Sequence, residues 1–398
     1  MAPVRMESKN TGRFLVLDSW RGICACLIIF LHTSANSPLF GLPFVRHAYL
    51  FVDFFFVLSG FVIAWNYEKK LHSWLLVKKF VFLRIGRLWP LHLAILGLYF
   101  ASESAKYLLT SSVAFNNPAF AYWQPWNVVG NIFLMPELFF TNEKFYFNPP
   151  TWSIAAEFYA YLIFAVLCFA KVSRSRYLAI FAAVATVVAI IIHPEENVAI
   201  HALMRSTIGF AVGCLCARTV SVYQSKNPGM MPKRRWLWSC LESGCVVLIV
   251  LFVSLAGATR WESLAVLVFA AAVLVYALEF GALSAVLKTR GIVWLGTLSY
   301  SIYMTHWFLL EKVISVGNLE RLFHRKLSVS VLENGVNVSR YGVTPVQGTL
   351  FYIVILAVTL IFSALTYRFI EEPARLWTRA RCNPKRPKIE GVQPQSQL

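Results

Sequence analysis

Charged residues are scarce in this chain. Of its 398 residues, 14% are charged and 58% are hydrophobic, and the mean hydropathy is +0.60. Soluble domains carry about 25% charged residues. The chain therefore has too little polar surface to cover a water-soluble globule of this size, and the composition predicts an integral membrane protein.

Several chemical signatures are also missing. The eight cysteines show no spacing typical of a zinc site, so we expect no bound metal. No Gly-x-Ser-x-Gly segment is present, and we interpret Ser59 as a small residue at a helix contact. The first apolar segment, near residue 15, lacks a cleavage site and carries Asp18 and Arg21, so we interpret it as a retained span.

Long apolar runs recur along the rest of the chain. About 20 apolar residues suffice to cross a bilayer as a helix. We therefore predict an all-α integral membrane protein of about ten transmembrane helices: 15–35, 48–67, 79–101, 152–171, 176–193, 199–219, 238–256, 260–281, 291–315 and 348–370. This gives a cytosolic segment 1–14, a single membrane domain 15–370, and a basic, largely disordered tail 371–398. The apolar stretch 126–140 is too short to span and is interpreted as interfacial.

The net charge of +18 is typical of nucleic-acid binding or of basic cytosolic loops. With ten spans, lysines and arginines gather by a wide margin on the side that holds both termini. The positive-inside rule then places both termini in the cytosol, and no nucleic-acid partner is needed. The sequon at Asn337 falls in an outer loop, where it is a glycosylation candidate in a eukaryotic host.

Ionisable residues within the spans are costly in lipid and usually functional. Depths estimated at 1.5 Å per helical residue place them in two layers. The outer layer holds His32, Asp53, Glu157, Arg205 and His306, and the inner layer holds Arg21, Arg84 and Arg87.

Each layer favours a chemistry. A neutral imidazole held by a carboxylate can accept a proton from a hydroxyl group, and His32 with Asp53 or Glu157 could form such a pair. Arginine pairs such as Arg84 and Arg87, on one helix face, suit phosphate recognition. The alternative for the arginines is simple anchoring at the cytosolic surface.

Seven segments in order resemble the acyltransferase 3 family of membrane acyl-CoA-dependent O-acyltransferases. They are LDSWRGICACLIIFLH, FVDFFFVLSGFVI, FLRIGRLWP, PPTWSIAAEFYAYL, MRSTIGFAVG, LGTLSYSIYMTHW and YRFIEEPARLW, which run through roughly residues 14–377. The resemblance implies transfer of an acyl group, commonly acetyl, from acyl-CoA as a co-substrate that is not permanently bound. The acceptor would be a hydroxyl group of a small metabolite or glycan.

The resemblance also implies roles for individual residues. Arg21, Arg84 and Arg87 would bind acyl-CoA, and His32 would act as general base beside Asp53 or Glu157. Supports or acceptor contacts would come from Arg205, Tyr303 and His306.

Two rival interpretations remain. Intramembrane His, Asp, Glu and Arg residues also mark the pathways of transporters, although no inverted repeat is visible here. A receptor or assembly factor without chemistry is the third interpretation. The acceptor, the acyl chain length, the oligomeric state and the membrane itself, plasma membrane or endomembrane, stay open.

Overall fold

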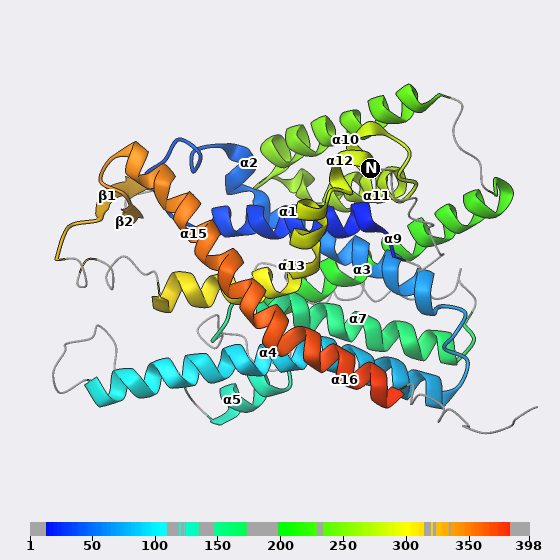
Figure 1. Cartoon of the computed structure of the whole chain (residues 1–398), viewed down its shortest axis with the longest axis horizontal. Helices are drawn as coiled ribbons and strands as arrows, with labels where there is room; N and C mark the ends of the chain where they lie inside the picture. The colour runs from blue at the N-terminus through cyan, green and yellow to red at the C-terminus, as the bar shows by residue number, and fades with distance from the viewer. Residues whose placement is uncertain are drawn as a thin grey trace, which may run out of the picture.

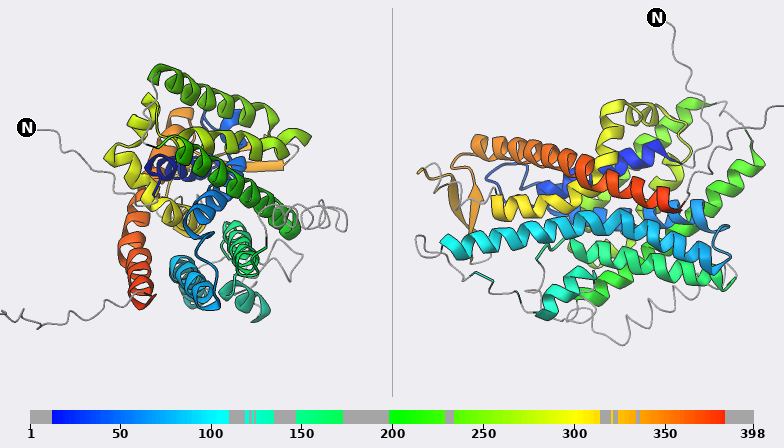
Figure 2. Two further views of the ribbon diagram at one scale, coloured as in Figure 1. Left: turned by 90° about the vertical axis from the view of Figure 1, so that its right-hand side faces the viewer. Right: turned by 60° about the horizontal axis from the view of Figure 1, so that its bottom comes forward.

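Long apolar helices lying roughly along one axis make up most of the chain (Figure 1). A computed structural model describes residues 13–109, 119–120, 123, 125–134, 147–172, 198–228, 234–313, 320, 324–333 and 336–382. Viewed along that axis in Figure 2, left, several helices are seen nearly end-on, as expected for a membrane bundle.

The helices and strands follow one another in this order: α1 (Leu15–His32), α2 (Pro43–Arg46), η1 (Ala48–Leu50), α3 (Phe51–Tyr67), α4 (Trp74–Leu109), α5 (Pro125–Ile132), α7 (Thr151–Phe169), α9 (Val198–Lys226), α10 (Arg235–Ala256), η3 (Arg260–Leu264), α11 (Ala265–Tyr276), α12 (Ala282–Leu287), α13 (Arg290–Phe308), η4 (Leu309–Val313), β1 (Ser328–Glu333), β2 (Val336–Tyr341), α15 (Pro345–Thr366), η5 (Tyr367–Glu371) and α16 (Glu372–Cys382).

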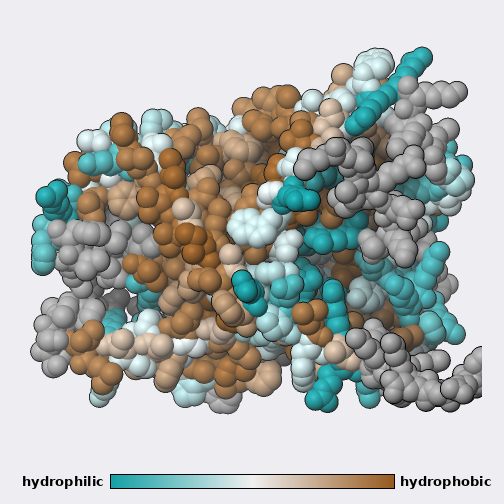
Figure 3. Space-filling model, viewed as in Figure 1, coloured by the Kyte–Doolittle hydropathy of each residue, from teal (hydrophilic) through white to brown (hydrophobic). Residues whose placement is uncertain are grey.

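The predicted all-α membrane architecture is confirmed. Among the described residues, seven helical segments are long and apolar enough to cross a membrane: Leu15–His32, Ala48–Tyr67, Trp74–Leu109, Thr151–Phe169, Leu203–Lys226, Arg235–Ala256 and Pro345–Cys382. Figure 3 shows hydrophobic side chains covering the middle of one face, with hydrophilic ones gathered toward the end where α16 finishes.

The other three predicted spans are not among these seven. The span 176–193 lies outside the described residues. The span 260–281 is the short η3 followed by the twelve-residue α11, and the span 291–315 is α13 followed by η4, a π-helical turn. In the segment 126–140, the described part contains the eight-residue helix α5.

Glycines bring two pairs of parallel helices into backbone contact. On α1 and α13, a Cβ atom at Gly22 would lie 2.5 Å from the Gly296 nitrogen. On α3 and α9, a Cβ atom at Gly60 or Gly213 would overlap the backbone of the opposite helix. Small residues at such contacts let helix backbones approach closely in a membrane, where packing drives association. These two tight pairs form the frame on which the site is built.

A small β-hairpin, absent from the sequence prediction, stands at one end of the bundle (Figure 1). β1 and β2 are antiparallel, with Ser330 opposite Ser339, and Ala35 after α1 bridges to Tyr341 on β2. The exposed Asn337 of the sequon lies on β2. The two strands of the hairpin are short and polar, so their hydropathy does not distinguish them from a loop.

The predicted tail, residues 371–398, begins inside a helix. α15, the π-helical turn η5 and α16 form one continuous helix from Pro345 to Cys382. α16 packs on α4, where Gly86 leaves room for the Thr378 side chain. The predicted tail is thus helical as far as Cys382, and residues 383–398 lie outside the described part.

Candidate functional site

A partly open cavity, with about 750 Å³ of empty space including solvent at its mouth, lies between α1, α3, α4, α7 and α13. Five residues singled out from the sequence line it: Arg21, Arg84, Arg87, Glu157 and Tyr303. The helices that supply them are far apart in the sequence, so the fold brings the predicted arginine layer together around one space.

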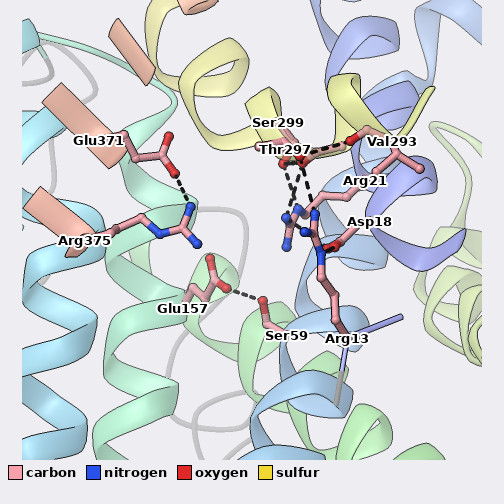
Figure 4. Close-up of polar contacts among 11 residues, drawn as sticks. Arg13, Asp18, Arg21, Ser59, Glu157, Val293, Thr297, Ser299, Glu371 and Arg375 are labelled. Atoms are coloured by element: carbon pink, nitrogen blue, oxygen red, sulfur yellow. Dashed lines mark hydrogen bonds and ion pairs between the residues drawn. The ribbon is translucent and has the colours of Figure 1, made fainter. Parts of the chain in front are cut away.

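Arg21 is fixed between α1 and α13. Its Nε donates to Ser299 Oγ at 2.7 Å, and its Nη2 lies 3.2 Å from Asp18 Oδ1, one turn earlier (Figure 4). Nη2 also donates to the Gly296 carbonyl oxygen at 3.3 Å. Because Gly22 and Gly296 let the two helices touch, this guanidinium spans the helix contact and lines the cavity beside it.

Glu157 on α7 is held by two hydroxyl groups. Ser59 on α3 and Tyr161, one turn further along α7, both donate to its Oε1 atom, and Figure 4 shows the Ser59 contact. Ser59, Tyr161 and Glu157 all line the cavity. The close helix contact expected at Ser59 is instead made by its neighbour Gly60, which leaves the Ser59 hydroxyl free to face the cavity.

Glu157 lines the same cavity as the arginines, although its predicted depth put it in the outer layer. The predicted depth was in error because α7 begins deeper in the bundle than hydropathy indicates. Asn148, just before the helix, donates to the Met304 carbonyl oxygen at 3.0 Å, and Ser153 pairs with the Tyr303 hydroxyl at 2.8 Å. The first turn of α7 is thus already embedded beside α13, and Glu157 lies about 6 Å further in than Ser153.

Arg84 and Arg87 project from α4 into the inner part of the cavity. The Arg84 guanidinium stacks over the rings of Tyr67 and Phe80, at 5.4 and 5.6 Å, and its Nη2 donates to the Tyr67 hydroxyl at 3.2 Å. Its buried Nε has no hydrogen-bond partner in the described part of the chain. Neither arginine forms an ion pair with a described residue, so both remain available for an anion.

A second, smaller and partly open cavity, with about 300 Å³ of empty space including solvent at its mouth, adjoins the first. Arg84 and Arg87 line both cavities, and Arg375, Thr378 and Arg379 of α16 line the second. Arg375 and Arg379 fall in the segment predicted to be a basic tail, 371–398. Their spacing of four residues in EEPARLWTRAR, which puts both on one helix face, was the signal that could have revealed them.

His32 and His306 lie outside the cavity lining, on the side toward the hairpin. Their rings stack at 5.4 Å, and the Trp307 ring meets His32 edge-on at 4.9 Å. His306 is fully buried, and its Nδ1 lies 2.7 Å from the Tyr303 carbonyl oxygen. A carbonyl oxygen can only accept, so Nδ1 carries the proton and Nε2 keeps its lone pair. That Nε2 has no partner among the described residues.

The predicted pairing of His32 with a carboxylate is not formed. Asp53 binds Arg205 through two contacts, Nε to Oδ1 at 3.0 Å and Nη2 to Oδ2 at 2.7 Å. Glu157 is held by Ser59 and Tyr161, and His32 makes no hydrogen bond with any described residue. α3 turns Asp53 toward α9, whereas His32 at the end of α1 faces α13.

Tyr303 stands between the cavity and the histidine pair. It lines the cavity, and its ring centre lies 5.8 Å from that of His306. Phe55 lines the same wall and meets the Tyr303 ring at 5.8 Å. Tyr303 therefore lies between the arginine-lined cavity and the two histidines.

Comparison with known proteins adds independent evidence. The family model described as "Acyltransferase domain" matches residues 14–368. A stretch of 105 residues is 37% identical to "Protein 2 in picA locus" of Rhizobium radiobacter, and it covers 26% of this chain and 53% of that protein. The chain thus spans about half the length of this curated relative. No solved structure matches the chain.

Proposed function

The chain belongs to the acyltransferase domain family, and we propose that it transfers an acyl group from acyl-CoA to a hydroxyl group of a small metabolite or glycan. Membership makes it a membrane acyltransferase. The donor, the base and the acceptor class are the proposed part. The observation that carries them is a cavity lined by arginines and by Tyr303, whose ring contacts His306 of the stacked histidine pair.

The donor side of this proposal rests on Arg21, Arg84 and Arg87. Guanidinium groups match phosphate oxygens in geometry and charge, and acyl-CoA carries phosphates at one end and its thioester at the other. With the phosphates near the arginines, the flexible arm of the donor extends along the cavity toward Tyr303. The apolar walls contributed by α3 suit that arm.

The acceptor side rests on His32. His32 is an exposed residue, whereas the Nε2 atom of His306 is buried, and we assign the acceptor hydroxyl to His32 for that reason. His32 takes the hydroxyl proton while the acceptor oxygen attacks the thioester carbonyl carbon. The carbon–sulfur bond then breaks, and the CoA thiolate leaves and takes up a proton. His306 stacks on His32 and orients it.

Asp53 and Arg205 have a supporting role in this scheme. Their bidentate pair joins α3 to α9, and α3 carries the cavity-lining Ser59. Glu157, held by Ser59 and Tyr161, places a negative charge near the arginines and keeps their side chains extended into the cavity.

The experiment measures transfer from labelled acetyl-CoA by purified protein across a panel of hydroxylated acceptors. We expect His32→Ala to lose turnover but to keep acetyl-CoA binding, and Arg84→Ala to weaken binding. His72→Ala, at an exposed histidine in the loop before α4, is the matched control and should behave as wild type. A wild-type protein that neither binds nor consumes acyl-CoA would refute the proposed donor.

The topology proposed with this function has ten spans and both termini in the cytosol. It is supported by α16, which lies at the end of the bundle opposite the hairpin (Figure 1). Labelling of Ser339→Cys in the hairpin by a membrane-impermeant thiol reagent should occur from the non-cytosolic side. Labelling from the cytosol would reverse the orientation.

A further inference from the structure

The second cavity brings together four guanidinium groups from two distant parts of the chain. Arg84 and Arg87 come from α4, and Arg375 and Arg379 come from α16, almost 300 residues later. Figure 4 shows the Arg375 guanidinium and the Glu157 carboxylate pointing into the same space between the helices. Arg84 and Arg87 also line the first cavity, so the two spaces adjoin.

This cluster has fewer ion pairs than arginines, although the carboxylates of Glu157 and Glu371 lie near it. Within the described residues, one of its four arginines forms an ion pair, Arg375 with Glu371 at 3.4 Å. Arg84, Arg87 and Arg379 form none, and the Arg84 Nε is buried without a hydrogen bond to a described residue. Like charges this close repel one another unless an anion lies between them. The cluster is thus suited to a ligand with more than one negative charge.

The second cavity is also a built feature of the fold. Gly86 on α4 leaves space for Thr378, and so α16 lies directly against α4. Glu371 is 1% exposed and accepts from Ser301 on α13 at 2.8 Å. Arg375 and Arg379, one and two turns after Glu371, therefore have a fixed direction along the cavity.

We propose that Arg375 and Arg379 join Arg84 and Arg87 to bind the phosphate groups of the donor, which makes α16 part of the donor site. The inference rests on the proposed function and names the part of acyl-CoA that this cavity takes. The second cavity lies toward the end of the bundle where α16 finishes, and the first continues inward. Phosphates bound in the second cavity leave the thioester arm to enter the first.

The test compares two donors that share the thioester arm. Acetyl-CoA carries the phosphates and the adenosine, whereas S-acetylpantetheine lacks both. Arg379→Gln should raise the KM for acetyl-CoA roughly tenfold or more and leave kcat/KM for S-acetylpantetheine unchanged. Arg375→Gln should act in the same direction. Arg381→Gln removes an equal charge from an exposed position on the same helix, and should match wild type for both donors.

A direct binding measurement separates this inference from the proposed function. Adenosine 3′,5′-bisphosphate carries two of the donor's phosphates and no thioester. Wild type should bind it and Arg379→Gln should bind it at least several-fold more weakly. Equal effects of Arg379→Gln on both donors, or an equal effect of Arg381→Gln, would overturn the inference while leaving acyl transfer intact. Binding that depends on Arg379 without any acyl transfer would instead overturn the proposed function.

Anionic lipid headgroups present the same phosphate chemistry. The donor comparison is therefore run in phospholipid-free detergent and in nanodiscs containing phosphatidic acid. A donor site predicts the same discrimination between the two donors in both. If Arg379→Gln abolishes stimulation by phosphatidic acid and leaves the KM for acetyl-CoA unchanged, the cluster binds lipid and the inference is wrong.

Discussion

Neutralising Asp53 is expected to destabilise the protein and not to remove a catalytic group. The Asp53 side chain is 4% exposed and that of Arg205 is 21% exposed, and two hydrogen bonds join them. Removing one partner of a buried ion pair costs about 3–5 kcal/mol. Because Arg205 keeps some contact with its surroundings, we expect Asp53→Asn to cost about 3 kcal/mol, at the lower end of that range.

The assay is unfolding of the purified protein in detergent, combined with acyl transfer measured below the unfolding temperature. Asp53→Leu with Arg205→Met removes both charges together and should be much closer to wild type than either single variant. Glu372→Gln, at an exposed carboxylate on α16, is the control for loss of one negative charge.

The opposite pattern would refute this reasoning. If Asp53→Asn unfolds at the same temperature as wild type and yet its acyl-transfer rate falls by a factor of about 100 or more, Asp53 takes part in the chemistry. The pair with Arg205 would then be a resting arrangement that opens during turnover.

Other expected outcomes concern separate features. His306→Gln should lower kcat about 100-fold and leave donor binding unchanged, and loss of donor binding in an equilibrium titration would contradict an orienting role. Gly60→Ala should destabilise the protein by about 1–3 kcal/mol, because its Cβ atom would meet the backbone of α9. At Gly244, an added Cβ atom would have no neighbour within 4 Å, so Gly244→Ala should stabilise the protein by up to about 1 kcal/mol. Equal unfolding midpoints for Gly60→Ala and Gly244→Ala would contradict the packing argument. Glu320 accepts hydrogen bonds from the Ser328 side chain and from two backbone amides, which hold the pKa of its carboxyl below the ordinary value of 4.5. A lowered pKa means that the stabilisation from these hydrogen bonds is complete above pH 4.5 and is lost as the pH falls through the lowered pKa. Amide hydrogen exchange at Ser328 should then become faster at low pH. An exchange rate that does not depend on pH, after correction for the intrinsic rate, would refute this prediction.

The sequence predicted the arginine group because its residues obey local rules. Arg84 and Arg87 share a face of one helix, and Arg21 lies near the same end of its own helix. Charge near that end of the bundle follows from the positive-inside rule. The cavity that these three arginines line could not be predicted from the sequence, because it depends on which helices are neighbours.

Partners across helices could not be predicted from the sequence for the same reason. Periodicity shows that Arg21 and His32 share one face of α1, but not that this face meets α13. Asp53 and Glu157 were therefore both candidates for pairing with His32, although Asp53 binds Arg205 on α9. Hydropathy likewise marks where an apolar run begins but not its depth, and Glu157 was placed too near the outer surface because α7 begins inside the bundle.

The π-helical turn Tyr367–Glu371 sets the rotation of everything that follows it. A π turn amounts to one extra residue in an α-helix, and each helical residue turns the chain by about 100°. Without that extra residue, α16 would be rotated by more than a quarter turn against α4, and Arg375 and Arg379 would point away from Arg84 and Arg87. The insertion of one residue thus determines whether this helix presents its charge to the bundle or to the solvent, and a change of length here alters the site where a change of side chain would not.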